Sequence, residues 1–113
     1  MTMDRPALPG SSGDATLTER IETVVHGRVQ AVGFRMFATR AATARGLVGW
    51  VANEADGSVR CVAEGPRPDL EALIRELTEG PSGSVVDRVD TSWSRATGAF
   101  DRFGVRSGWH GGD

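Results

Sequence analysis

The sequence contains no lysine and no tyrosine, a single cysteine, and only two side-chain amides, Gln30 and Asn53. All thirteen cations are therefore arginines, which stand against fifteen carboxylates and leave a net charge of −2. This balance provides no basic excess that would attract a nucleic-acid backbone or an anionic membrane. We therefore expect neither a nucleic acid nor a membrane as a partner.

The lone cysteine, Cys61, cannot form an internal disulfide, and one sulfur cannot assemble a cysteine-rich zinc site. No base stands next to it in the sequence, so we interpret it as a core residue. Apolar runs such as residues 46–52 are far shorter than the roughly 20 residues of a membrane helix. The N-terminus also lacks the basic-then-apolar pattern of a secretion signal. These absences predict a cytoplasmic protein with no metal and no cofactor.

The residues that are present fit one small domain, with 39% apolar and 25% charged side chains over 113 residues. Residues 1–18 are rich in small and polar types without apolar periodicity, which predicts a flexible N-terminal tail. We place the domain at residues 19–106 and a frayed C-terminal tail at residues 107–113.

Apolar periodicity predicts two helices and up to five strands in this domain. A turn at Asp56 and Gly57 joins two of the strands in a hairpin, because Asp-Gly supplies the positive φ of a tight reversal. In the later strand region the apolar alternation is centred on Val85, Val89 and Trp93. The predicted strands cover residues 20–26, 47–53 and 58–64, with one or two more within 84–93 and 100–106, and the predicted helices cover 34–45 and 66–80.

The order strand, helix, strand, strand, helix, strand predicts an α+β fold, the ferredoxin-like (split βαβ) sandwich. In this fold two helices pack on one face of an antiparallel sheet, here of four to five strands. The first helix is a crossover between the first two strands, so these strands should run parallel and end at the same edge of the sheet. That arrangement places the loop of residues 27–33 near Asn53.

The loop after the first strand has features of an anion site. It contains Gly27 and Gly33 and leads into a helix start, where backbone N–H groups lack intrahelical partners. Arg35 falls in the first helical turn, and its guanidinium fork fits two oxygens of a phosphate or carboxylate. The glycines match neither the Walker nor the dinucleotide pattern, so spacing alone favours an anion site only slightly over an ordinary loop.

The segment VHGRVQAVGFR, residues 25–35, and the following GLVGWVANEADGSV, residues 46–59, resemble the signature of the acylphosphatase family. Enzymes of this family cleave the carboxyl-phosphate bond of acyl phosphates. The resemblance is specific over these two linked motifs and extends in general layout over about residues 20–106. It implies the ferredoxin-like fold, acylphosphatase activity on a small acyl phosphate, and a monomeric protein.

The same resemblance assigns roles to residues of the two motifs. It implies that Arg35 binds the substrate phosphate and that Asn53 positions the attacking water. Phosphoryl transfer to water depends mainly on positioning and charge stabilisation, which suits these residue types. An asparagine can orient water but cannot take its proton, so we expect the substrate phosphate to accept it. The implied phosphate cradle is the loop of Gly27, Arg28, Val29, Gln30, Ala31 and Val32.

Ala31 departs from the family pattern, in which a glycine usually follows the glutamine. If this position takes a positive φ, a side chain there costs roughly 1 kcal/mol. We expect such strain to loosen the cradle or slow turnover without abolishing it.

Other polar residues have simpler interpretations. His26, at a strand end, is more often structural than catalytic in such a position. Glu54 and Asp56 are close enough in sequence to suggest an acid/base pair, but hairpin turns commonly collect such residues. Gln30 is expected to tie the loop together, and Trp50 is expected to pack on the sheet.

Two other functions stay open. One is an RNA-binding sheet of similar topology, which the net charge of −2 and the shortage of strand aromatics disfavour. The other is a catalytically weak acylphosphatase-like module with a binding or regulatory role.

Overall fold

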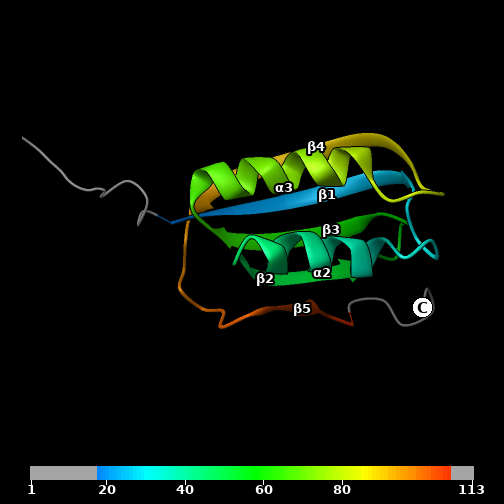
Figure 1. Ribbon diagram of the computed structural model, residues 1–113. Coiled ribbons are helices and arrows are strands. Elements are labelled where there is room, and N and C mark those ends of the chain that lie inside the picture. The colour runs from blue at the N-terminus through cyan, green and yellow to red at the C-terminus, as the bar shows by residue number, and fades with distance from the viewer. Residues whose placement is uncertain (1–17, 108–113) are drawn as a thin grey trace, which may run out of the picture.

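Two helices lie side by side on one face of a five-stranded sheet in the computed structural model, which describes residues 18–107 (Figure 1). The ferredoxin-like α+β fold predicted from the sequence is confirmed. Residues 1–17 and 108–113, which contain nearly all of the two predicted tails, lie outside the described residues. The elements in chain order are β1 (Glu19–Arg28), α2 (Phe34–Ala44), β2 (Val48–Asn53), β3 (Val59–Gly65), α3 (Arg67–Glu79), β4 (Val85–Arg95) and β5 (Phe103–Val105).

Each helix forms because one apolar stripe along it is buried against the sheet. The chain leaves α2 at Gly46, whose φ of 70° turns the backbone, and the N–H of Leu47 then donates to the carbonyl of Ala42 at 3.0 Å. No helix within residues 18–107 is long and apolar enough to cross a membrane. The buried residues are Phe34, Ala38, Ala41 and Ala42 on α2, and Leu70, Ala72, Leu73 and Leu77 on α3.

The strand order is β4-β1-β3-β2-β5. Both β1 and β2 are antiparallel to β3, which lies between them, so β1 and β2 run in the same direction. This confirms the prediction from the crossover rule. The carboxyl ends of β1 and β2 therefore emerge at one edge of the sheet, which is also where α2 begins (Figure 1).

The sheet is mixed rather than wholly antiparallel, because β5 pairs parallel with β2. β4 and β5 occupy opposite edges, and the chain between them crosses one end of the sheet, where it is drawn in orange in Figure 1. After this crossing β5 turns back along the sheet. It therefore runs opposite to β4 and in the same direction as its neighbour β2.

A β-bulge in β4 changes which of its side chains face the helices. The pairing with β1 shifts between His26 and Gly27, which leaves Asp87 as the extra residue. Val86 consequently packs against the core, whereas Val85, on which the sequence alternation was centred, is 52% exposed. Glycine is required opposite the bulge, since a Cβ on Gly27 would lie 2.1 Å from the carbonyl oxygen of Val85.

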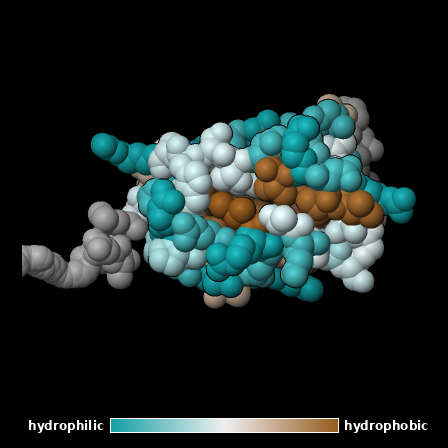
Figure 2. Space-filling view, turned by 90° about the horizontal axis from the view of Figure 1, so that it is seen from above, coloured by the Kyte–Doolittle hydropathy of each residue, from teal (hydrophilic) through white to brown (hydrophobic). Residues whose placement is uncertain are grey.

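Apolar side chains reach the surface along the seam between α3 and β4 (Figure 2). Ile74 of α3 and Val86 and Val89 of β4 line a groove there. β4 is an edge strand, and its exposed Arg88 and Asp90 place charges along that edge. Such charges discourage pairing with a strand of another molecule.

Glu64 anchors the chain that crosses from β4 to β5. Its side chain is only 3% exposed, and its carboxylate accepts hydrogen bonds from the N–H groups of Thr97 and Gly98, both at 3.0 Å. The Thr97 hydroxyl donates at 2.7 Å and Arg20 Nη1 at 3.1 Å. Burial alone would raise the pKa of Glu64, but these hydrogen bonds outweigh it and hold the pKa below the ordinary value of 4.5.

We predict that Glu64→Gln lowers the free energy of unfolding by roughly 2 kcal/mol or more at pH 7, because it removes a buried charged acceptor. The folded pKa is depressed, so this contribution is fully present above the ordinary pKa of 4.5 and is lost as the pH falls through the folded pKa. Urea unfolding of both proteins at pH 7 and in acid measures it. Glu71→Gln, at an exposed site on α3, is the matched control. Equal stability of wild type and Glu64→Gln at pH 7 would contradict the account.

Candidate active site

The loop between β1 and α2 carries backbone N–H groups that are available to a ligand. Within residues 18–107, the N–H groups of residues 30–33 donate to no backbone carbonyl. The first hydrogen bond inside α2 runs from the N–H of Phe37 to the carbonyl of Gly33 at 3.0 Å. The first turn of α2 holds neither a capping side chain nor an acid. This end of the helix therefore suits an anion, because its first N–H groups have no acceptor within the helix and because it carries a partial positive charge.

Gln30 fixes the loop against the turn between β2 and β3. Its Nε2 donates to the carbonyl of Glu54 at 2.8 Å and to the carbonyl of Ser58 at 2.9 Å. The prediction that Gln30 ties the loop in place is therefore confirmed. Both carbonyls accept from the side-chain amide of Gln30. Hydrogen bonds from this loop to a ligand would therefore come from its backbone N–H groups.

Asp56 has a structural role in the turn between β2 and β3. The Asp56 carboxylate accepts the N–H of Ser58 at 2.9 Å and its hydroxyl at 2.6 Å, and these hydrogen bonds lower the pKa of Asp56. Glu54 lies 3.5 Å from Arg60. Both carboxylates thus have structural partners, in agreement with their interpretation as turn residues.

Arg35 and Asn53, which lie in different motifs of the sequence, line one pocket of about 210 Å³. Arg35 is half-buried in the first turn of α2, and Asn53, at the last position of β2, is 2% exposed. Ala31 and Gly33 of the loop line the same pocket. The expected proximity of the loop to Asn53 is therefore confirmed. The other lining residues are Val29, Phe34, Met36 and Val105.

The six residues of the implied cradle do not form one uniform loop. Gly27 and Arg28 are the last paired residues of β1, opposite Val86 and Val85 of β4. Val29 is fully buried, so its side chain belongs to the core while its backbone begins the loop. The loop proper consists of residues 29–33, between the end of β1 and the start of α2.

Two pocket residues, Met36 and Val105, were not identified from the sequence. Met36 stands next to Arg35, so its place in the first helical turn was an available signal. Val105 had no such signal, because it reaches the pocket only through the pairing of β5 with β2.

His26 and Cys61 lie away from this pocket. His26 Nε2 contacts Asp90 Oδ2 at 3.1 Å and lies 3.2 Å from Arg88 Nη2, in a cluster of polar side chains between β1 and β4. Cys61 is fully buried, and burial raises the pKa of its thiol to about 12, which keeps it neutral. Neither residue is placed to act as a base or nucleophile there. Among residues 18–107, no group of three or more His, Cys, Asp or Glu side chains could hold a metal ion.

Ala31 has a φ of 61°, and within residues 18–107 it is the only residue other than glycine with a positive φ. Residue 31 therefore does take the positive φ at which a side chain is strained. The left-handed conformation brings the Cβ close to the neighbouring backbone, at a cost of roughly 1 kcal/mol or more. Strain of this kind often accompanies a binding loop whose surroundings fix its shape.

We predict that Ala31→Gly raises the free energy of unfolding by about 0.5 kcal/mol, because relief of the left-handed strain slightly exceeds the entropy that glycine adds to the unfolded chain. Ala38→Gly in the middle of α2 is the control and should lose more than about 1 kcal/mol, because it lowers helix propensity and also removes a buried methyl group. Urea unfolding of wild type and of both variants measures the change in the free energy of unfolding for each substitution. A loss of stability in Ala31→Gly as large as that in Ala38→Gly would contradict the assigned strain.

Comparison with known proteins agrees with this architecture. The family model described as "Acylphosphatase" matches residues 21–105. The acylphosphatase of Salinibacter ruber is 50% identical over 88 residues, which cover 78% of this chain and 93% of that protein. The acylphosphatase of Koribacter versatilis is 41% identical over 110 residues, 95% of this chain and 100% of that protein. The crystal structure of acylphosphatase from Bacillus subtilis superposes with a TM-score of 0.76 at 36% identity, covering 78% of this chain and 98% of that chain. The chain therefore belongs to the acylphosphatase family and is a hydrolase of acyl phosphates.

Proposed function

We propose that this hydrolase holds the phosphate of its substrate with Arg35 and the loop amides, and orients the attacking water with Asn53. One observation carries the proposal: Arg35, the loop and Asn53 line the same small pocket. The pocket lies where the positive end of α2 meets the carboxyl end of β2. A site that must grip an anion and place one water beside it needs these two components.

Phosphate binding is supported by the donors available in the loop and in the first turn of α2. The N–H groups of residues 30–33 have no backbone partners among residues 18–107, and α2 adds its own first-turn donors. The guanidinium of Arg35 supplies a charge and a fork of N–H groups suited to two phosphate oxygens. These donors are fixed before the substrate arrives, so they stabilise the charge that spreads over the equatorial oxygens in the transition state.

The role of Asn53 follows from its burial and its chemistry. At 2% exposure the amide is held in a fixed place at the end of β2. Its carbonyl oxygen can accept a hydrogen bond from water and so direct the water oxygen toward phosphorus. The new oxygen-phosphorus bond forms as the bond from phosphorus to the carboxyl oxygen breaks, and the carboxylate departs.

The proton of the attacking water passes to a phosphate oxygen in this scheme. Among the described residues that line the pocket there is no histidine, aspartate or glutamate that could accept it. A departing carboxylate is a weak base, so it leaves without a general acid. Positioning and electrostatic stabilisation therefore supply the catalysis that the protein provides.

We further propose a small-molecule acyl phosphate as the substrate, with no nucleic-acid partner. On the sheet face opposite the helices, the Arg106 guanidinium lies 4.3 Å from the ring centre of Trp50, which covers an aromatic that an RNA base would need for stacking. Arg60 pairs with Glu22 on that face.

The monomeric state and the cytoplasmic location stay predictions. The names of the relatives favour an enzyme over a binding module.

We predict that Arg35→Ala lowers kcat/KM by at least about 100-fold with a marked rise in KM, because it removes phosphate binding and transition-state charge stabilisation. Asn53→Ala should lower kcat by about 100-fold with a smaller effect on KM, because it mispositions the water. Phosphate release from benzoyl phosphate measures both, with folding checked by circular dichroism. Arg75→Ala, an exposed arginine of α3, is the control. Full activity in a folded Arg35→Ala or Asn53→Ala variant would refute the corresponding role.

We also predict that hydrolysis is unchanged in excess EDTA and in His26→Ala, because the scheme uses neither a metal nor a histidine. The assay is the same phosphate release, compared with and without chelator. A rate that collapses in EDTA and returns on adding a divalent cation would show that the scheme lacks a component.

A further inference from the structure

Large apolar side chains are exposed at three places in the described residues. These are Met36, Val85 and Val105, with exposures of 52%, 52% and 51%. Met36 and Val105 both line the pocket of Arg35 and Asn53, whereas Val85 lies at the start of β4 and lines no part of it. Exposure alone is common for single apolar residues, but apolar side chains that line a pocket beside a few polar groups are typical contacts for the apolar part of a ligand.

The strand pairing explains how Val105 reaches the pocket. Val105 is opposite Val51 in the parallel pair of β5 and β2. Phe103, two residues earlier, is buried against α2 and the core. Because side chains two apart in a strand share a face, Val105 continues this apolar row beyond the core, toward the end of β2 where Asn53 lies.

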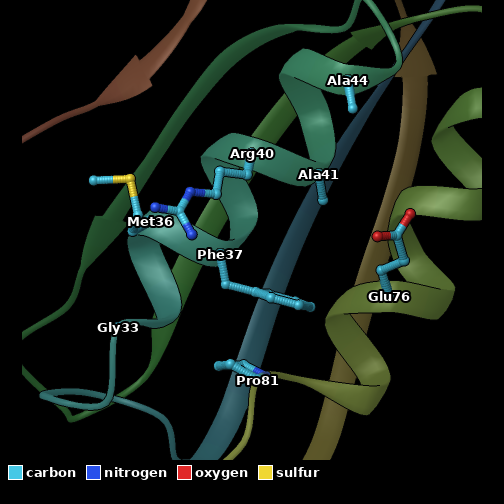
Figure 3. Close-up of a pocket in the computed structure, with 8 residues that line it drawn as sticks. All are labelled: Gly33, Met36, Phe37, Arg40, Ala41, Ala44, Glu76 and Pro81. Carbon is cyan, nitrogen blue, oxygen red and sulfur yellow. The ribbon is translucent and has the colours of Figure 1, made fainter.

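Met36 supplies an apolar surface from the helix side. It follows Arg35 in the first turn of α2, and Figure 3 shows its side chain pointing away from α3, toward the side of α2 where β5 lies. Met36 and Gly33 also border a neighbouring groove of about 500 Å³ between α2 and α3, in which Phe37 and Pro81 expose apolar surface (Figure 3). A ligand anchored at Arg35 therefore has apolar contacts available on leaving the phosphate site.

We propose that Met36 and Val105 form the contact surface for the acyl group, and that they make the enzyme favour acyl phosphates with an apolar acyl group, aromatic or alkyl, over acetyl phosphate. The inference rests on the proposed function, because it requires the phosphate to lie at Arg35. The acyl group of such a substrate carries no charge. The two exposed side chains provide an apolar surface that suits this group and does not suit the charged phosphate. Contact with them removes apolar area of both partners from water.

The test compares acetyl, butyryl and benzoyl phosphate in wild type and in near-isosteric variants. Met36→Gln keeps side-chain length and helix propensity, and Val105→Thr keeps side-chain shape and strand propensity. Val85→Thr makes the same change at an equally exposed valine outside the pocket and serves as the control. Each protein is compared by kcat/KM for the three substrates, after circular dichroism has shown equal folding.

Wild type is expected to show kcat/KM rising from acetyl to butyryl to benzoyl phosphate. Met36→Gln and Val105→Thr should each lower kcat/KM for benzoyl phosphate by about 5-fold, chiefly through KM, and leave acetyl phosphate within about 2-fold. Val85→Thr should change neither. Equal losses for all three substrates, or the same change of ratio in Val85→Thr, would overturn the proposal.

Failure of the acyl surface is distinguishable from failure of the proposed site. If wild type hydrolyses all three substrates and Arg35→Ala loses them all, but the substrate ratio is unchanged in Met36→Gln and Val105→Thr, only the acyl surface is refuted. If a folded Arg35→Ala keeps its activity, the placement of the phosphate is refuted, and the acyl surface with it.

Discussion

The hydrogen bonds of Gln30 are the constraint on which the site depends. The Gln30 side-chain amide donates hydrogen bonds to the carbonyls of Glu54 and Ser58. These hydrogen bonds hold the loop after β1 against the turn after β2. β3 separates these two strands in the sheet, so no backbone ladder joins their ends directly. The side-chain tie takes its place and keeps the loop amides beside Asn53. The proposed catalysis by positioning would tolerate little movement of this loop, and the Gln30 hydrogen bonds restrain the loop through a neutral side chain.

The surroundings of this loop break several local rules, each with a structural reason. Gly27 lies opposite the β4 bulge because the strand crosses too closely for a Cβ. Ala31 holds a left-handed conformation that disfavours its side chain. The first turn of α2 has no cap and no acid, although both would stabilise a free helix end. A phosphate bound there, as we propose, would accept hydrogen bonds from the start of the helix and thereby stabilise the folded protein. Such departures from local preference are typical of functional sites.

Sequence patterns predicted the parts of the fold that depend on local periodicity and on chain direction. The apolar stripes of α2 and α3 indicated both helices, and the crossover rule predicted that the loop after β1 lies near Asn53. The features that were missed depend on long-range pairing. The register shift at Gly27 exchanged Val86 for Val85 on the inner face. The crossing anchored by Glu64 made β5 parallel to β2, and this pairing alone brings Val105 to the pocket.

The central claim is that inorganic phosphate binds at the loop and the start of α2. The most direct test is a titration of ¹⁵N-labelled protein with phosphate, followed through the backbone amide resonances and the Arg35 side-chain signal. The account predicts saturable shifts concentrated in residues 29–36 and Asn53, and their loss in Arg35→Ala. Saturable shifts centred on other residues, or shifts in the loop that persist unchanged in a folded Arg35→Ala, would contradict it.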